Sequence, residues 1–182
     1  MAKILEILAS GFEEIEAVAP ADIWRRLGFD VTLAGLDDMQ ITGAHGITLE
    51  CDALLDEVAA LDFDAVFLPG GMPGSTNLRD SVVVQEIVKS MASAGKVVSA
   101  ICAAPMVLSQ CGVLKGRKFT MYPGMTGFLV SGDVPQNGSA VRDGNIVTGK
   151  GPGAAFDFAV EVASALGVDA SACCQAMMME KR

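Results

Sequence analysis

The chain is poor in histidine and has no paired metal-binding cysteines. Its 182 residues include one histidine, His45, and none of its five cysteines forms a CxxC pair. Common zinc sites combine several such ligands at short spacing, so the sequence predicts no metal. The glycine-rich turns lack the Lys-Ser/Thr ending of a P-loop, and we expect no organic cofactor. A Ser-His-Asp triad would have to be built around the single imidazole.

Positive charge is also scarce, and no apolar stretch is long. Thirteen lysines and arginines stand against 22 aspartates and glutamates, which gives a net charge of −9. Nucleic acids and anionic membranes need clustered basic residues, so neither is an expected partner. No stretch approaches the roughly 20 apolar residues that span a bilayer, and the N-terminus lacks the apolar core of a signal peptide. We expect a cytoplasmic protein whose cysteines are free thiols.

Apolar strands alternate with amphipathic helices along the whole chain. The predicted strands cover residues 3–8, 30–34, 65–68, 97–101 and 118–121, with hairpins within 39–49 and 140–148. The predicted helices cover residues 13–27, 81–92, 103–110, 154–166 and 170–178. Pro20 should kink or split the first of them. This alternation indicates one α/β domain, residues 1–182, with a mainly parallel sheet covered on both faces.

Binding sites in such sheets form at the carboxyl ends of the strands. Three features of this sequence follow predicted strand ends: the loop at 10–16, the Gly70-Gly71 turn and Cys102. A strand that turns directly into a helix exposes its elbow residue at this edge, and the helix N-terminus favours a thiolate. The alternative for Cys102 is a buried structural cysteine, which is the usual fate of a free thiol.

The residues around Cys102 offer hydrogen-bond donors and a carboxyl group. Backbone N–H groups of Gly71 and Ala103 could stabilise an oxyanion there, although a glycine turn without a role is the alternative. Glu14 and Glu16 lie two residues apart on the first helix, so they point differently and at most one reaches the sulfur. A carboxyl group buried beside a sulfur should stay protonated. His45 is expected at a hairpin tip, in solvent or at an interface.

Four sequence blocks resemble those of the DJ-1/ThiJ/PfpI superfamily and occur in the same order. They are residues 9–16 (ASGFEEIE), 67–71 (FLPGG), 100–105 (AICAAP) and 148–158 (TGKGPGAAFDF). The resemblance covers nearly the whole chain. It implies a three-layer αβα sandwich of the flavodoxin type and a homodimer, with the first helix and the 151–153 turn at the interface. It is closest to the branch of the parkinsonism-associated protein and bacterial ThiJ-like proteins, because the peptidase-like branch has His where this chain has Ala103.

The resemblance also implies the roles of individual residues. It makes Cys102 the nucleophile, Glu16 the carboxylate, and Gly71 and Ala103 the oxyanion donors. The residues expected to line the entrance are Gly70, Glu14, His45, Tyr122 and Pro152. Some relatives have His where this chain has Tyr122, and a phenol with a pKa of roughly 10 is no base near neutral pH.

Two functions follow from the resemblance. The first is glyoxalase III or protein deglycase activity, in which Cys102 attacks a small aldehyde such as methylglyoxal or a glycated protein side chain. Glu16 then moves a proton through an enediol and lactate leaves, without glutathione, metal or cofactor. The alternative is a stress-protective redox sensor or chaperone-like protein whose Cys102 oxidises to sulfinic acid without significant turnover. No residue set supports a thiamine-pathway role.

Overall fold

The centre of the protein is a seven-stranded sheet. The structure is a computed structural model that describes residues 1–130 and 132–179. The strands follow the order β5-β2-β1-β6-β7-β9-β8, and every neighbouring pair is parallel except β8 and β9. Their bounds are β1 (Lys3–Leu8), β2 (Asp30–Gly35), β5 (Ala53–Leu54), β6 (Ala65–Leu68), β7 (Val97–Ile101), β8 (Ala140–Asp143) and β9 (Ile146–Gly149).

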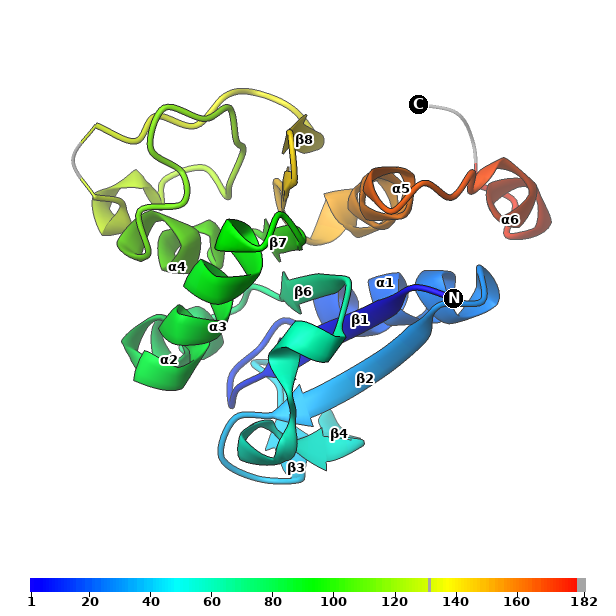
Figure 1. The fold of residues 1–182 in the computed structure, drawn as a ribbon, viewed down its shortest axis with the longest axis horizontal. Helices are drawn as coiled ribbons and strands as arrows, with labels where there is room; N and C mark the ends of the chain where they lie inside the picture. Colours follow the sequence, from blue (N-terminus) through cyan, green and yellow to red (C-terminus); the bar gives the residue numbers. More distant parts are fainter. Residues whose placement is uncertain (131, 180–182) are drawn as a thin grey trace.

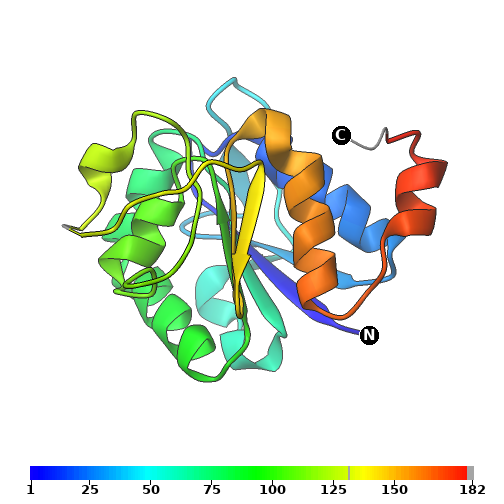
Figure 2. The same cartoon turned by 90° about the horizontal axis from the view of Figure 1, so that it is seen from above.

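Helices cover both faces of the sheet (Figure 2). One face carries α1 (Glu14–Arg26) and α5 (Ala155–Ala165), and the other carries α2 (Gly74–Asp80), α3 (Val82–Ser93) and α4 (Pro105–Gln110). The last helix, α6 (Ser171–Ala176), lies at the outer edge beyond α5 (Figure 1). A separate hairpin joins β3 (Gln40–Thr42) to β4 (Thr48–Glu50). Short 3-10 turns are η1 (Leu55–Glu57), η2 (Ala60–Asp62), η3 (Thr126–Phe128) and η4 (Pro152–Ala154). No helix of the described ranges is long and apolar enough to cross a membrane.

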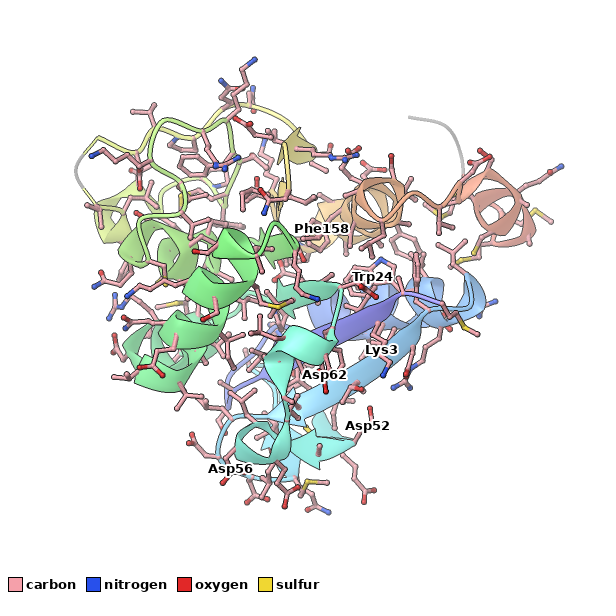
Figure 3. All side chains as sticks on the ribbon, viewed as in Figure 1. Lys3, Trp24, Asp52, Asp56, Asp62 and Phe158 are labelled. Atoms are coloured by element: carbon pink, nitrogen blue, oxygen red, sulfur yellow. The ribbon has the colours of Figure 1, made fainter. Side chains whose placement is uncertain are left out.

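An aromatic cluster fixes α1 against α5 and the sheet. The rings of Trp24 and Phe67 meet edge to face with centroids 5.1 Å apart, and those of Phe67 and Phe158 lie 5.2 Å apart. The Trp24 indole N–H donates to the Ala159 carbonyl at 2.9 Å, and Figure 3 shows Trp24 and Phe158 side by side between the two helices. Such rings bury large apolar area with defined geometry. They hold in place the face of α1 that also carries Glu16, which is fully buried.

The predicted fold class is confirmed, and most elements lie where they were expected. The strands predicted at 3–8, 65–68 and 97–101 have the observed bounds, and both hairpins are present. The predicted split at Pro20 is wrong, because α1 continues through this residue. Ala17 and Ala21 are buried on either side of it, so packing of one continuous face outweighs the lost backbone bond.

One predicted strand is absent and one predicted helix begins later than expected. Residues 118–121 form no strand, because their backbone groups bond outside a ladder: the Thr120 N–H donates to Thr148 Oγ1 at 2.9 Å, and the Lys118 N–H to an Asp143 carboxylate at 2.8 Å. Helix α4 begins at Pro105 instead of Ala103, because residues 102–104 form a turn. Helix α2 was not predicted from the sequence.

One side chain contradicts the apolar pattern of its strand. Glu6 lies in the middle of β1, is fully buried, and neither carboxyl oxygen has a hydrogen-bond partner among the described residues. Burial raises its pKa well above 4.5, and the nearby Arg25 only partly opposes this. The Arg25 guanidinium donates instead to Asp52 at 3.1 Å and to the Val31 carbonyl at 3.0 Å. Burial without a hydrogen-bond partner therefore favours the neutral form of Glu6 and costs stability.

Replacing Glu6 with methionine should stabilise the protein. The change keeps a linear side chain and removes two unsatisfied buried oxygens, so we expect a gain of about 1–3 kcal/mol at pH 7. Because the folded-state pKa lies above the unfolded one, the ionisation cost is absent below the unfolded pKa of about 4.5 and grows as the pH rises toward the folded pKa. Denaturant unfolding at pH 4 and pH 7 checks this. Glu6→Gln, which keeps polar atoms, should gain less than Glu6→Met, and equal or lower stability of the methionine variant would contradict the prediction.

Candidate functional site

Three neighbouring strands deliver the candidate site to one edge of the sheet. β1, β6 and β7 lie side by side and end in the loop before α1, in the Gly70-Gly71 turn and at Cys102. The loop and the turn are joined by the backbone, since the Glu13 N–H donates to the Gly70 carbonyl at 2.9 Å. The structure thus brings together the residues that the sequence placed at strand ends.

Cys102 has a strained backbone. Its φ of 63° lies in the left-handed region, which costs a non-glycine residue on the order of 1–3 kcal/mol. Two backbone hydrogen bonds hold it there: its N–H donates to the Gly149 carbonyl at 2.9 Å, and its carbonyl accepts the Tyr122 N–H at 2.8 Å. The side chain is half-buried. This conformation turns the sulfur toward Glu16 instead of into the core.

Glu16 is the carboxyl group beside the sulfur. Its Oε2 accepts the Gly70 N–H at 2.8 Å and the carboxyl hydrogen-bonds to Cys102, whereas Oε1 is buried without a partner in the described chain. Burial raises the pKa of Glu16 to about 8, although the bonds with Cys102 and Gly70 lower it. The group is therefore neutral at pH 7 and has an O–H to donate.

Both glycines of the turn are required by geometry. A β-carbon on Gly70 would collide with Glu16 Oε2 and with the β-carbon of Cys102. Gly71 has a φ of 90°, and a β-carbon there would collide with the backbone of Phe12 and Glu13. Because neither glycine has a side chain, the turn can approach Cys102 closely. The N–H of Gly71, like the N–H of Ala103, then bonds to the sulfur of Cys102.

The pKa of Cys102 corrects a prediction from the sequence. Burial, followed by the charge of an ionised Glu16, raises it to about 12, and the N–H groups of Gly71 and Ala103 only partly lower it. Helix α4 has six residues and begins three residues after Cys102, so its N-terminus lies farther from the sulfur than the sequence predicted. The state of the thiol therefore depends on whether Glu16 keeps its proton.

The surroundings decide where the charge resides once the pair loses one proton. A thiolate would have the N–H groups of Gly71 and Ala103 and the O–H of Glu16, and it would be partly open to solvent. A Glu16 carboxylate would have the Gly70 N–H and a buried oxygen with no partner among the described residues. The better solvated anion is the thiolate, so we assign the remaining proton to Glu16.

Glu14 and His45 lie together, away from the sulfur. Glu14 Oε1 accepts the backbone N–H of His45 at 2.7 Å, and Oε2 lies 2.9 Å from His45 Nδ1. Burial alone would raise the pKa of Glu14, but these hydrogen bonds lower it, and the same pairing raises the pKa of His45. Glu13, Glu14 and His45 have ligand atoms within 4.8 Å of one another. Since Glu14 already holds the β3–β4 hairpin with both oxygens, the group serves the hairpin.

Tyr122 and Pro152 line a pocket that adjoins the backbone of Cys102, although Cys102 is not among its walls. Its volume is about 470 Å³, and its walls also include Lys150, Gly151 and Ser139. Lys150 and Ser139 were not predicted as site residues, although Lys150 lies inside the block at 148–158. A larger groove of about 1080 Å³ lies between α5 and α6 and contains none of the candidate residues. The predicted homodimer stays a prediction; the half-exposed Ile15 and Val18 on α1 are side chains that it would cover.

The fold is a three-layer αβα sandwich. Its candidate site, at the edge of the sheet, is a strained cysteine that hydrogen-bonds to a neutral carboxyl group. These two features place the chain in the class of α/β sandwich proteins with a reactive cysteine. The model of the DJ-1/PfpI family matches residues 2–165, and the chain belongs to the DJ-1/PfpI family.

Relatives with assigned names support this membership over most of the chain. Protein dj-1beta of Drosophila melanogaster is 40% identical over 164 residues, which cover 89% of this chain and 88% of that protein. Deglycase PfpI of Pyrococcus furiosus is 38% identical over 153 residues, 83% of this chain and 91% of that protein. The solved structure of oxidized Toxoplasma gondii DJ-1 has a TM-score of 0.93 and 31% identity, and the match covers all of both chains.

Alkylation of Cys102 by iodoacetamide should reveal the shared proton. We expect the rate to rise with pH around an apparent pKa near 8 that belongs to the Glu16–Cys102 pair. Glu16→Leu removes the O–H donor to the thiolate and should slow alkylation at pH 7 by about tenfold. Intact mass with peptide mapping measures the rate at Cys102.

Glu16→Gln is the matched control, because its amide N–H can still donate to the sulfur without ionising. It should alkylate at pH 7 within about threefold of the wild type. A Glu16→Leu variant that reacts faster than the wild type would show that the charge of Glu16 dominates, and would reverse the assignment of the proton.

Proposed function

We propose that the chain detoxifies reactive carbonyl compounds through Cys102, acting on α-oxo aldehydes such as methylglyoxal and on glycated protein side chains. The observation that carries the proposal is the buried hydrogen bond between Glu16 and Cys102, with the Gly71 and Ala103 N–H groups directed at the same sulfur. Relatives named deglycases, at 36–38% identity, support the same class of chemistry.

The first step joins the sulfur to the aldehyde carbon. The C–S bond forms, the C=O π bond breaks, and the proton of Glu16 moves to the new oxygen, which gives a hemithioacetal and leaves Glu16 as a carboxylate. Once the sulfur is bonded to carbon, the N–H groups of Gly71 and Ala103 can stabilise negative charge on the adjacent oxygen. The neutral carboxyl at pH 7 therefore supplies the proton that this step consumes.

The second step moves a proton between two carbons. The Glu16 carboxylate removes the proton from C1, which gives an enediolate, and returns it to C2, while the proton on the C1 oxygen passes to the C2 oxygen. The product is a lactoyl thioester of Cys102. Water then cleaves the C–S bond and releases lactate and the thiol. The sum is methylglyoxal plus water to lactic acid, with no oxidant or reductant.

On a glycated side chain the same residues would release an amine. The sulfur bonds to the carbon that carries the hydroxyl and the amine, the C–N bond breaks, and the Glu16 proton goes to the departing nitrogen. The later steps are the same. Because removal of free methylglyoxal also reverses early glycation, assays of this reaction need a control for scavenging in solution.

Turnover of methylglyoxal tests the proposal. Cys102→Ser should lower kcat/KM at least about 10³-fold, because a serine hydroxyl ionises far less readily. Glu16→Gln should lower it about 10²–10⁴-fold, because the amide cannot move the proton. Lactate production measures both. Cys111→Ser, a half-buried cysteine elsewhere in the fold, is the matched control and should keep full activity. Equal turnover by the wild type and Cys102→Ser would remove the proposal.

The second candidate function is redox sensing by Cys102. The O–H of Glu16 and the N–H groups of Gly71 and Ala103 would also stabilise a sulfinate, which needs hydrogen bonds to its oxygens. The intact mass after mild peroxide distinguishes the two candidates. Gain of two oxygens at Cys102 alone, without methylglyoxal turnover, would favour the sensor. Scattered oxidation of several cysteines and methionines would exclude it.

A further inference from the structure

The pocket beside Cys102 is larger than methylglyoxal requires. Its volume of about 470 Å³ lies within the roughly 300–1,000 Å³ of small-molecule sites. Methylglyoxal has five heavy atoms, which fill at most about 150 Å³ at about 30 Å³ for each water-sized group. A substrate that fills this pocket would carry a substantial group beyond its aldehyde.

The backbone of Cys102 connects directly to two walls of this pocket. Its carbonyl accepts the N–H of Tyr122, and its N–H donates to Gly149, the residue before Lys150. The two walls also touch each other, since a β-carbon on Gly151 would lie 3.1 Å from the Tyr122 ring. The pocket therefore adjoins the backbone of Cys102, and because Cys102 is not among its walls, it would take the part of a ligand farther from the sulfur.

The walls combine apolar surface with one positive charge. The ring of Tyr122 and the rings of Pro123 and Pro152 supply the apolar part, and Lys150 is the one charged residue that lines the pocket in the described chain. Its ammonium donates to the neutral Asn137 Oδ1 at 3.2 Å, and it forms no ion pair with any described carboxylate. The backbone N–H of Lys150 donates to the Ser139 carbonyl at 2.9 Å, which fixes its position.

The charge of Lys150 is opposite to that of its surroundings. The chain carries a net charge of −9, and the acidic residues Glu13 and Glu14 lie at the start of α1. Such a field repels anions from most of the surface. An ammonium with no carboxylate partner among the described residues, at the wall of this pocket, is therefore the feature that would let the far end of an anionic substrate bind.

We propose that the pocket of Tyr122, Pro152 and Lys150 binds the far end of the substrate, and that this end is a carboxylate on an apolar body. Lys150 is then a specificity-determining residue. The inference rests on the proposed function only in that an aldehyde adds to Cys102. In that addition the C–S bond forms, the C=O π bond breaks, and the Glu16 proton moves to the aldehyde oxygen, which leaves Glu16 as a carboxylate. Turnover is not required.

Protection of Cys102 from iodoacetamide tests the subsite without turnover. Benzaldehyde and 4-carboxybenzaldehyde both form hemithioacetals, and neither has the α-oxo group that isomerisation requires. We expect 4-carboxybenzaldehyde to protect at about fivefold lower concentration, the effect of one partly exposed ion pair. In Lys150→Met the ratio of the protecting concentrations of benzaldehyde and 4-carboxybenzaldehyde should fall to about one, while the protecting concentration of benzaldehyde stays unchanged. The preference should also weaken in high salt.

Lys89→Met, on α3 and outside the walls of the pocket, is the matched control and should keep the fivefold preference. Equal protection by both aldehydes in the wild type, or a preference that survives Lys150→Met, would overturn the subsite. The two proposals fail separately: methylglyoxal turnover without a carboxylate preference removes only the subsite. A preference that depends on Lys150, without turnover, supports the subsite and removes only the enzyme.

Discussion

The hydrogen bond between Glu16 and Cys102 is the interaction on which the candidate site depends. It needs a strand order that places β1, β6 and β7 side by side, so that α1 and the Cys102 turn meet at one edge. It needs Trp24 seated against Phe67 and Ala159, because that packing holds the buried face of α1. It also needs a residue without a β-carbon at Gly70. The core thus determines the distance between two side chains that exchange one proton.

Two glutamates among the described residues, Glu6 and Glu16, are fully buried, and their environments explain their different consequences. Glu16 has the Gly70 N–H and the sulfur as partners, whereas both oxygens of Glu6 lack partners among the described residues. Burial raises the pKa of each. Only Glu16 can exchange its proton with a neighbour whose anion is solvated by other donors. Burial alone favours the neutral form of a carboxyl group. A neighbouring group that can accept its proton is what gives the neutral carboxyl a chemical role.

Much of this could be predicted from the sequence, because it follows from patterns of short range. Alternating strands and helices predicted the layers, and strand ends predicted that Cys102 and Gly70 would meet. Helical spacing predicted that Glu14 and Glu16 would diverge, but not that Glu14 would bind the His45 hairpin, since that contact joins distant segments. The segment 118–121 resembled a strand because apolar alternation does not reveal that Thr148 and Asp143 side chains would take its N–H groups. The pKa of Cys102 depends on burial and on the proton of Glu16, which no local pattern contains.

Tyr122, which is no base near neutral pH, has a second role to play as a wall of the pocket that also contains Lys150. A histidine there would offer a base or a second positive charge, whereas the phenol ring offers an apolar wall. In the proposed steps at C1 and C2, Glu16 gives and takes the proton, so those steps would need no second base. Tyr122 would then serve to shape the pocket, in which Lys150 is the single charged residue of the described chain. The proposals thus assign proton transfer to Glu16 on α1, and binding of the rest of the substrate to residues that follow β9 and to the segment at 121–123.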